Sequence, residues 1–342
     1  DNHEKVVFVE DEQSGLKAII AVHNTNLGPS LGGCRMWPYE NEMDALNDAL
    51  RLSRGMSYKN AMAGLPLGGG KAVIIANSKT DKSETLFKAF GKCVEKMGGK
   101  YITAEDVGMT TQDMMIIATE TQYIAGLPTG DHASGDPSPF TARGVFNGIK
   151  AAVKYKLGKD NLDGLTVAVQ GVGHVGLFLC EHLHNDGAKI LVSDIVQEHL
   201  DEAVEKYGAT VVAPDEILSV KCDVLSPCAL GAVLNDDTIP NLKTTIVAGG
   251  SNNQLANDAH GVRLMDRGVL YAPDYVINAG GIINVSGETS GNYDLDSINQ
   301  KVDNIYDTLI HIFERSDAEK RPTNVVADEM AEEILAKARA AK

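Results

Sequence analysis

The chain is short of basic residues and contains no long hydrophobic run. Its 342 residues include 31 Lys and Arg against 47 Asp and Glu, which gives a formal net charge of −16. Such a charge repels phosphate backbones and anionic lipid headgroups. No apolar stretch approaches the ~18 consecutive residues that a membrane-spanning helix requires. We therefore expect neither nucleic acid nor a membrane as a partner, and expect a small molecule instead.

Cysteine is also scarce, and its pattern excludes two further classes of protein. The five cysteines are an odd number without a C-x-x-C pair, so they indicate neither a disulfide framework nor a zinc site. We accordingly predict no bound metal. The first residues lack the basic start and apolar stretch of a signal peptide, which favours a cytoplasmic location.

The first part of the chain predicts an α/β domain. Two Val- and Ile-rich segments joined by a polar turn indicate a β-hairpin, and Asn41 is suited to cap a helix whose first turn is acidic. Glycine-rich stretches at 28–33 and 68–70 indicate tight turns or close backbone approach. The remaining expected elements are strands at 5–10, 16–23, 71–76 and 101–104, and helices from 41 onward and at 83–97.

The second part predicts a doubly wound sheet. A segment rich in Gly, Pro, Asp and Ser at 126–139 interrupts the pattern and indicates a hinge. Beyond it, strands at 165–170 and 189–194 alternate with helices, as in a Rossmann-type fold. The predicted division is an α/β domain over 1–133, a Rossmann-type domain over 134–317, and a final helical segment over 318–342 that packs back on the first domain.

A G-x-G-x-x-G motif follows the strand at 165–170 and opens a helix. In that context Gly171 permits a sharp turn, Gly173 lets the backbone approach a pyrophosphate, and Gly176 allows close packing of helix and strand. Asp194 ends the next strand, where a carboxylate accepts hydrogen bonds from a ribose diol and repels a 2′-phosphate. The motif favours NAD over NADP, and its alternative is a glycine turn in an ordinary βαβ unit.

Two lysines and one aspartate form a candidate reacting site. Lys59 continues the predicted helical stripe of Ala45, Ala49, Leu52 and Met56, and Lys71 follows three glycines. An inward-facing ammonium is costly unless it binds an anion or loses its proton, so one lysine suits a carboxylate and the other suits a base. Asp106 lies just beyond a strand end and could reach the same place. The alternative is that both lysines extend to the surface and Asp106 caps a turn.

The chain resembles the glutamate/leucine/phenylalanine/valine dehydrogenases, and most of all the leucine enzymes of that family. The resemblance implies that 1–133 is a substrate-binding and oligomerisation domain and 134–317 an NAD-binding domain, with an active-site cleft between them. It also implies homo-oligomers (octamer or dimer) and the reversible oxidative deamination of an amino acid to a 2-oxo acid and ammonia. It covers nearly the whole chain and is carried by the segments at 31–37, 56–59, 66–73, 101–108 and 274–281.

The same resemblance implies roles for individual residues. Lys59 would hold the substrate α-carboxylate, Lys71 would activate water, and Asp106 would bind the amino group and shuttle protons. The other implied substrate-binding residues are Leu31, Gly32, Gly33, Met56, Ala104, Ile282 and Val285. The implied cofactor-binding residues are Gly171, Gly173, His174, Val175, Gly176, Asp194, Thr141, Asn253 and Asn278.

The expected substrate is a branched-chain aliphatic L-amino acid: leucine, or also valine or isoleucine. Leu31 and Val285 stand where the family's glutamate enzymes carry a lysine and a serine, so an acidic side chain would be left unpaired. Phenylalanine remains an alternative substrate, and a non-catalytic NAD-binding sensor is an alternative of another class. Cys34, in place of an expected threonine, and the hinge residues Asp131 and His132 depart from the leucine-enzyme pattern.

Overall fold

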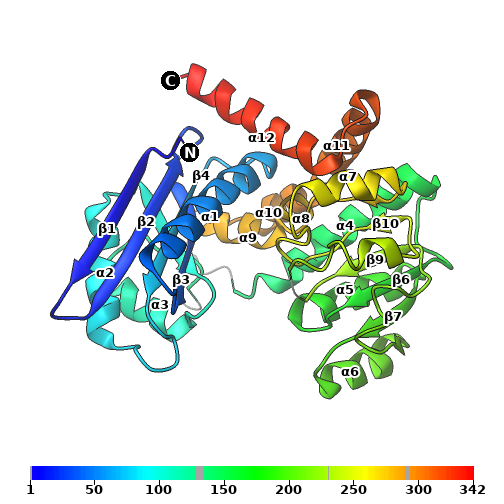
Figure 1. Cartoon of the computed structure of the whole chain (residues 1–342), viewed down its shortest axis with the longest axis horizontal. Coiled ribbons are helices and arrows are strands. Elements are labelled where there is room, and N and C mark those ends of the chain that lie inside the picture. The colour runs from blue at the N-terminus through cyan, green and yellow to red at the C-terminus, as the bar shows by residue number, and fades with distance from the viewer. Residues whose placement is uncertain (1, 128–134, 230, 290–292) are drawn as a thin grey trace. The chain divides into compact units, whose positions relative to one another are not determined.

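The chain folds into two compact units, shown in the computed structural model of Figure 1. The structure describes residues 2–127, 135–229, 231–289 and 293–342. Unit 1 comprises Asp1–Gly135, Val285–Asp294 and Ala331–Lys342, and unit 2 comprises Asp136–Asn284 and Leu295–Met330. The predicted boundary after residue 133, together with Asp131 and His132, lies outside the described residues.

Unit 1 is built on a five-stranded sheet with the order β1-β2-β4-β3-β5. The pairs β1–β2 and β2–β4 are antiparallel, whereas β3 runs parallel to both β4 and β5. Its strands and helices are β1 (Lys5–Asp11), β2 (Leu16–Asn24), β3 (Ser30–Trp37), α1 (Glu42–Met62), β4 (Gly68–Ile75), α2 (Glu84–Lys96), β5 (Tyr101–Glu105) and α3 (Thr111–Ala118). The predicted hairpin is confirmed, and so is the Asn41 cap, whose side chain accepts from Asp44 N.

Both faces of this sheet are covered by helices. On one face, Ile19, Ala21 and Val73 pack with Ala45 and Ala49 of α1. On the other face, the alternate strand residues pack with apolar side chains of α2 and α3. The sheet is therefore the middle of three layers, and its central strands β4 and β3 are screened from solvent.

The two glycine-rich stretches belong largely to strands, so the expectation of turns there is wrong. The second one opens β4, and most of the first forms the start of β3, a strand that the sequence analysis missed. A Cβ at Gly69 would collide with Ser57 of α1, and one at Gly70 would lie 2.6 Å from the ring of Tyr101. The glycines are needed for close packing across the sheet, not for a reversal of the chain.

The buried stripe of α1 also differs from the predicted one. It passes through Ser53 and Ser57, whereas Leu52, Met56 and Lys59 are only half-buried. The two serine hydroxyls can be buried because histidine rings hydrogen-bond to them. Their short side chains also let α1 approach the sheet closely.

Unit 2 confirms the expected doubly wound fold. Its six-stranded sheet has the order β11-β10-β9-β6-β7-β8, and all pairs are parallel. Numbered within this unit, the order is that of the Rossmann sheet, with its reversal between β6 and β9. The strands are β6 (Thr166–Gln170), β7 (Lys189–Ser193), β8 (Thr210–Val211), β9 (Val224–Pro227), β10 (Ile246–Val247) and β11 (Leu270–Tyr271).

The remaining regular elements of the described chain are helices. Those that belong to unit 2 alone are α4 (Ser138–Leu157), α5 (His174–Asn185), α6 (Gln197–Tyr207), the 3₁₀ turn Ile239–Asn241, α7 (Ala259–Asp266), α8 (Asp274–Ile277), α10 (Leu295–Asp303) and α11 (Ile305–Glu319). Two helices, α9 (Gly280–Thr289) and α12 (Thr323–Ala340), begin in unit 2 and end in unit 1. In the described part of the chain, no helix combines the length and hydrophobicity that a membrane crossing requires.

We predict that Gly69→Ala destabilises unit 1 by about 2 to 3 kcal/mol, because the added methyl group forces α1 away from β4. Gly55→Ala is the matched control, since a Cβ at Gly55 on α1 would meet no described atom within 4 Å. That control should gain about 0.5 to 1 kcal/mol from its higher helix propensity. Urea denaturation of both variants tests the packing argument, and equal midpoints would contradict it.

Candidate active site

Three charged side chains meet at the centre of the unit 1 sheet. Lys71 projects from β4 and is 6% exposed. Its Nζ donates to Oδ2 of Asp106, which follows the end of β5. Nε of Arg35 on β3 donates to the same oxygen at 3.2 Å. The strand order β4-β3-β5 brings the three residues together, although they lie far apart in the sequence.

Burial and charge act in opposite directions on this ion pair. Burial lowers the pKa of Lys71, Asp106 partly opposes that change, and the guanidinium of Arg35 lowers it further. Burial alone would raise the pKa of Asp106, but Lys71 and Arg35 together hold it below its usual value. The site thus combines an ionised carboxylate with an amine that gives up its proton more readily than an ordinary lysine.

Arg35 is itself held from the other side. Its Nη1 donates to Oδ2 of Asp48 on α1 at 2.8 Å, and the hydroxyl of Tyr39 donates to the same oxygen at 2.6 Å. Nη2 of Arg51 donates to the second oxygen of Asp48 at 3.0 Å. The guanidinium of Arg35 therefore bridges two carboxylates.

Sequence reasoning missed the role of Arg35. Its guanidinium adds to the effect of burial and lowers the pKa of Lys71, whereas the sequence analysis gave Arg35 no role. Lys59 lies on α1 and is half-buried, so the expectation that both lysines point fully inward holds for Lys71 alone. A correct assignment of β3 would have been the signal, because it places Arg35 beside β4 and β5.

Several of the predicted substrate-binding residues lie close to this ion pair. A Cβ at Gly32 would lie 3.3 Å from Cγ of Met56, and one at Gly33 would lie 2.7 Å from Cβ of Asp106. Leu31 is fully buried in β3. Ala104, on β5, and Ile282 and Val285, on α9, are all half-buried.

The glycine motif of unit 2 forms a loop between β6 and α5. Gly171 has a φ of +92°, in the left-handed region, and a Cβ there would lie 2.6 Å from Cβ of Ala229. A Cβ at Gly176 would collide with the carbonyl of Gly171. At Gly173, by contrast, it would meet no described atom within 4 Å. The backbone at Gly173 is thus open to a ligand at the N-terminus of α5, as a bound pyrophosphate requires.

The other predicted cofactor residues surround this loop with polar groups. Asp194 accepts from Val172 N at 2.7 Å and from Val196 N at 2.9 Å, and each oxygen keeps a lone pair for a further donor. Nδ2 of Asn278 donates to Asn252 Oδ1 at 2.7 Å, while its buried Oδ1 has no partner among the described residues. An amide group of a ligand would satisfy that oxygen, so the residues present fit a nicotinamide dinucleotide.

The remaining cofactor candidates occupy defined positions in unit 2. His174 and Val175 form the first turn of α5, and Val175 reaches Gly250, whose added Cβ would lie 3.3 Å from its Cγ1. Thr141, on α4, faces the start of α9, and Asn253 adopts a left-handed conformation with a φ of +52°.

Family models match both units. Residues 3–123 match the model described as Glu/Leu/Phe/Val dehydrogenase, dimerisation domain. Residues 134–196 and 192–341 match the model described as Glutamate/Leucine/Phenylalanine/Valine dehydrogenase. Together the two models cover nearly the whole chain.

Individual proteins with known names are similar over the same length. A leucine dehydrogenase from Thermoactinomyces intermedius is 53% identical over 334 residues, covering 98% of this chain and 91% of the relative. A valine dehydrogenase from Streptomyces albus is 46% identical over 341 residues, covering 99% and 93%. The crystal structure of L-tryptophan dehydrogenase from Nostoc punctiforme aligns with a TM-score of 0.89 at 47% identity, covering 99% of this chain and 97% of that one.

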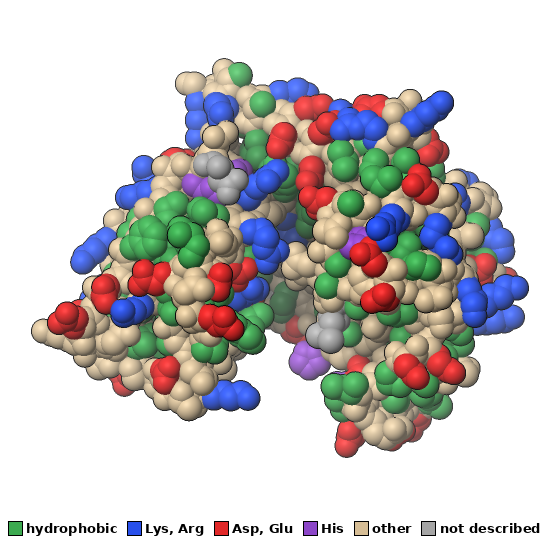
Figure 2. All heavy atoms as spheres, viewed as in Figure 1, with side chains coloured by type: hydrophobic (Ala, Val, Ile, Leu, Met, Phe, Trp, Pro, Cys, Tyr) green, Lys and Arg blue, Asp and Glu red, His purple; other side chains and the backbone are tan. Residues whose placement is uncertain are grey.

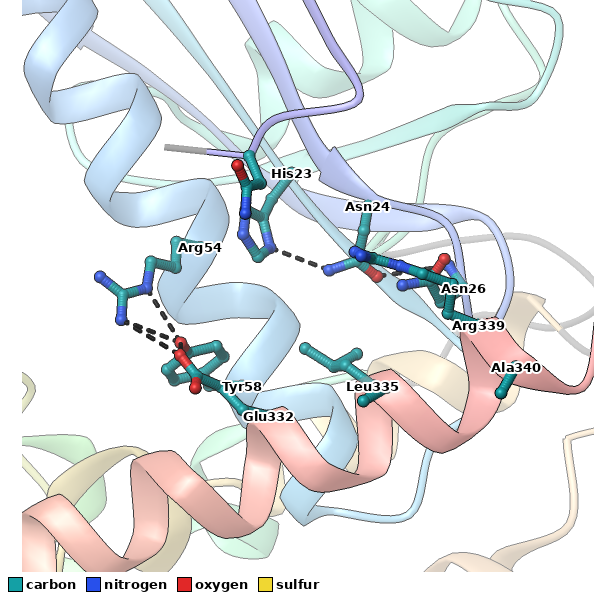
Figure 3. A pocket seen from close by; sticks show the side chains of 11 residues that line it. His23, Asn24, Asn26, Arg54, Tyr58, Glu332, Leu335, Arg339 and Ala340 are labelled. Carbon is teal, nitrogen blue, oxygen red and sulfur yellow. Dashed lines mark hydrogen bonds and ion pairs between the residues drawn. The ribbon is translucent and has the colours of Figure 1, made fainter.

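A cavity of about 500 Å³ in unit 1 lies between α1 and α12, and none of the predicted site residues lines it. Figure 3 shows Arg54 reaching Tyr58 and Glu332 across it, with His23 beside them. Nδ1 of His23 lies 2.8 Å from Oγ of Ser57. Burial lowers the pKa of His23 to about 4, and the nearby positive groups add to that effect.

We predict that the protein loses stability as the pH falls from 6.5 toward about 4, because the unfolded chain protonates His23 in this range and the folded chain does not. In His23→Asn, the loss of unfolding free energy over this pH range should be smaller by about 1 kcal/mol, a value reduced to allow for the partial exposure of the ring. Thermal unfolding between pH 4 and 7 measures the effect. His184→Asn, at an exposed histidine, is the control, and equal pH dependence in the two variants would refute the assignment.

Proposed function

The chain belongs to the glutamate/leucine/phenylalanine/valine dehydrogenase family, and on that premise we propose that it oxidatively deaminates a branched-chain aliphatic L-amino acid with NAD, reversibly. The observation that carries the proposal is the contact of the buried Lys71 and the half-buried Arg35 with Asp106, beside the Gly32–Gly33 backbone. In the proposed reaction, amino acid, NAD⁺ and water give the 2-oxo acid, ammonium, NADH and a proton. Leucine is the first candidate substrate.

The residues of unit 1 would divide the work on the amino acid. The ammonium of Lys59 would hold the α-carboxylate, and the ionised carboxylate of Asp106 would receive the α-amino group. Lys71 would take a proton from the water that attacks the imine carbon, because its lowered pKa provides a neutral amine nearer to physiological pH. Burial of the group keeps bulk water away and strengthens each of these interactions.

The residues of unit 2 would hold the cofactor. The open backbone at Gly173 suits the pyrophosphate, Asp194 suits a ribose diol, and the buried Oδ1 of Asn278 suits the nicotinamide amide. When bound, NAD accepts the hydride from the substrate Cα. No basic residue occurs at 195–197 after Asp194, which supports NAD over NADP.

Apolar side chains support the choice of substrate. Leu31 and Met56 offer no partner to a second carboxylate, so an acidic substrate would lose several kcal/mol. The named relatives are dehydrogenases of leucine, valine and tryptophan, and these three amino acids differ mainly in the size of an apolar side chain. Those names support a dehydrogenase over a non-catalytic sensor and keep an aromatic substrate as the rival.

Assembly into a homo-oligomer stays a prediction. β1 is an edge strand of the unit 1 sheet, and its Phe8 is 62% exposed. Hydrophobic side chains also gather over the β1–β2 hairpin in Figure 2. A free strand edge beside apolar surface is suited to pairing with a second copy.

We predict turnover of leucine with NAD, with kcat/KM for leucine at least ~10-fold above that for phenylalanine or tryptophan. NADH absorbance with each amino acid and with NAD or NADP measures both preferences. A higher kcat/KM for tryptophan would overturn the branched-chain assignment, and no turnover with any aliphatic or aromatic amino acid would overturn the proposed function.

Lys71→Ala should lower kcat by ~10³-fold with little change in melting temperature, because it removes the proposed base. Lys59→Ala should mainly raise KM, by ~10- to 100-fold, because it removes a charge-assisted hydrogen bond to the carboxylate. Lys88→Ala, at a half-buried lysine of α2 that is paired with Glu84, is the control and should match the unaltered enzyme. Near-normal kcat in the folded Lys71 variant would rule out its assigned role.

A further inference from the structure

One carboxylate oxygen of Asp106 accepts hydrogen bonds from both Lys71 and Arg35. For the proposed reaction to proceed, Lys71 must lose its proton. When Lys71 becomes neutral, Asp106 keeps a charged partner only through Arg35. Without that partner, a carboxylate in this buried position would itself tend to take up the proton. The proton would then sit on the group that must stay negative to receive the substrate ammonium.

We propose that Arg35 is a positioning residue that holds Asp106 in place and ionised throughout the reaction, so that the mobile proton is carried by Lys71. This inference rests on the proposed function and adds to it a residue that touches neither the substrate nor the cofactor. It assigns separate tasks to the two cations: Lys71 exchanges protons, and Arg35 supplies a charge that does not change.

The chemistry of arginine suits that task. Its guanidinium stays protonated throughout the working pH range, and it is planar, so it can donate in two directions at once. Arg35 uses Nε toward Asp106 and Nη1 toward Asp48. Asp48 is anchored in turn by Tyr39 and Arg51, which fixes the guanidinium between two acids. Burial lowers the pKa of Arg35, but the two carboxylates outweigh it and raise the pKa overall.

Other titratable groups around Lys71 keep one charge state in the working range. Burial raises the pKa of the Cys34 thiol on β3 and that of the Tyr101 hydroxyl on β5, so both stay neutral. Asp113 on α3 is paired with Lys82 at 2.5 Å. Lys59 lies on α1 and is half-buried. Arg35 is therefore the charged side chain that contacts the Lys71–Asp106 pair directly.

The first test is the pH dependence of kcat/KM in Arg35→Gln. Loss of a nearby cation raises the pKa of Lys71, so the rising limb of the profile should move upward by ~1 pH unit. The value of kcat at neutral pH should fall ~10-fold as a result. Arg35→Lys keeps a positive charge, so its rising limb should lie close to that of the unaltered enzyme. Arg263→Gln removes a guanidinium whose side chain is 53% exposed and is paired with Asp236 in unit 2; it is the matched control and should leave the limb unmoved.

Chemical rescue gives a second readout that a merely structural role would not produce. Arg35 lines a solvent-connected pocket of about 570 Å³ together with Trp37, Asp48 and Val107. Added guanidinium at ~20 mM, far below denaturing concentrations, should enter this pocket in Arg35→Ala and raise its activity ~10-fold. Arg263→Ala, at a guanidinium paired with Asp236 in unit 2, should show no such response. Absence of rescue in folded Arg35→Ala would contradict the proposal.

The titration of Lys71 can also be followed without turnover. Acetic anhydride labels neutral amines, and mass spectrometry of the labelled peptide as a function of pH reports the proton on Lys71. An upward shift in Arg35→Gln, or in Arg35→Ala if the first variant does not fold, supports the role of Arg35. If the unaltered protein is inactive but the labelling profile of Lys71 still shifts upward in the Arg35 variant, the proposed function is wrong and the electrostatic role of Arg35 stands. An unmoved labelling profile in folded variants overturns the inference whether or not the enzyme is active.

Discussion

The chemistry of unit 1 depends on keeping an ammonium dry beside a carboxylate. Lys71 is buried almost completely, and its contact with Asp106 offsets part of the cost of removing its charge from water. The pair can exist because three parallel strands place residues from distant parts of the chain side by side. Close approach of α1 to Gly69 then seals the sheet face from which Lys71 projects. Loss of that approach would hydrate the pair and return the pKa of Lys71 toward that of an ordinary lysine.

The proposed function would use different physical means in the two units. In unit 1 it would rely on side-chain charges, which are strong over short distances and sensitive to pH. At the loop Gly171–Gly176 of unit 2 it would rely instead on backbone amides and the N-terminus of α5, which do not titrate. Asp194 supports that loop, since its carboxylate accepts hydrogen bonds from Val172 N and Val196 N. The proposal accordingly assigns proton exchange to Lys71 in unit 1.

Much of this arrangement could be predicted from local sequence, and the failures share one cause. The Gly171–Gly176 motif and the Asn41 cap are contiguous patterns whose meaning depends on nearby residues, and both were identified. The strand β3 was missed because Gly32 and Gly33 disfavour a strand in isolation, and only packing against β4 and β5 makes them suitable. The role of Arg35 was missed for the same reason. Its partners Asp48 and Asp106 are defined by the fold and not by spacing along the chain.

Charge balance explains why the proposed substrate must carry both an amino group and a carboxylate. Among the described side chains, Lys71 and Arg35 are matched by Asp106 and Asp48, and Lys59 adds the positive charge that the proposal assigns to the α-carboxylate. A zwitterion adds no net charge to this buried place, whereas a simple amine or a simple acid would add one. The α-amino group then competes with Lys71 for Asp106, which favours release of the Lys71 proton as substrate binds. A neutral, apolar side chain against Leu31 is the arrangement that leaves this balance undisturbed.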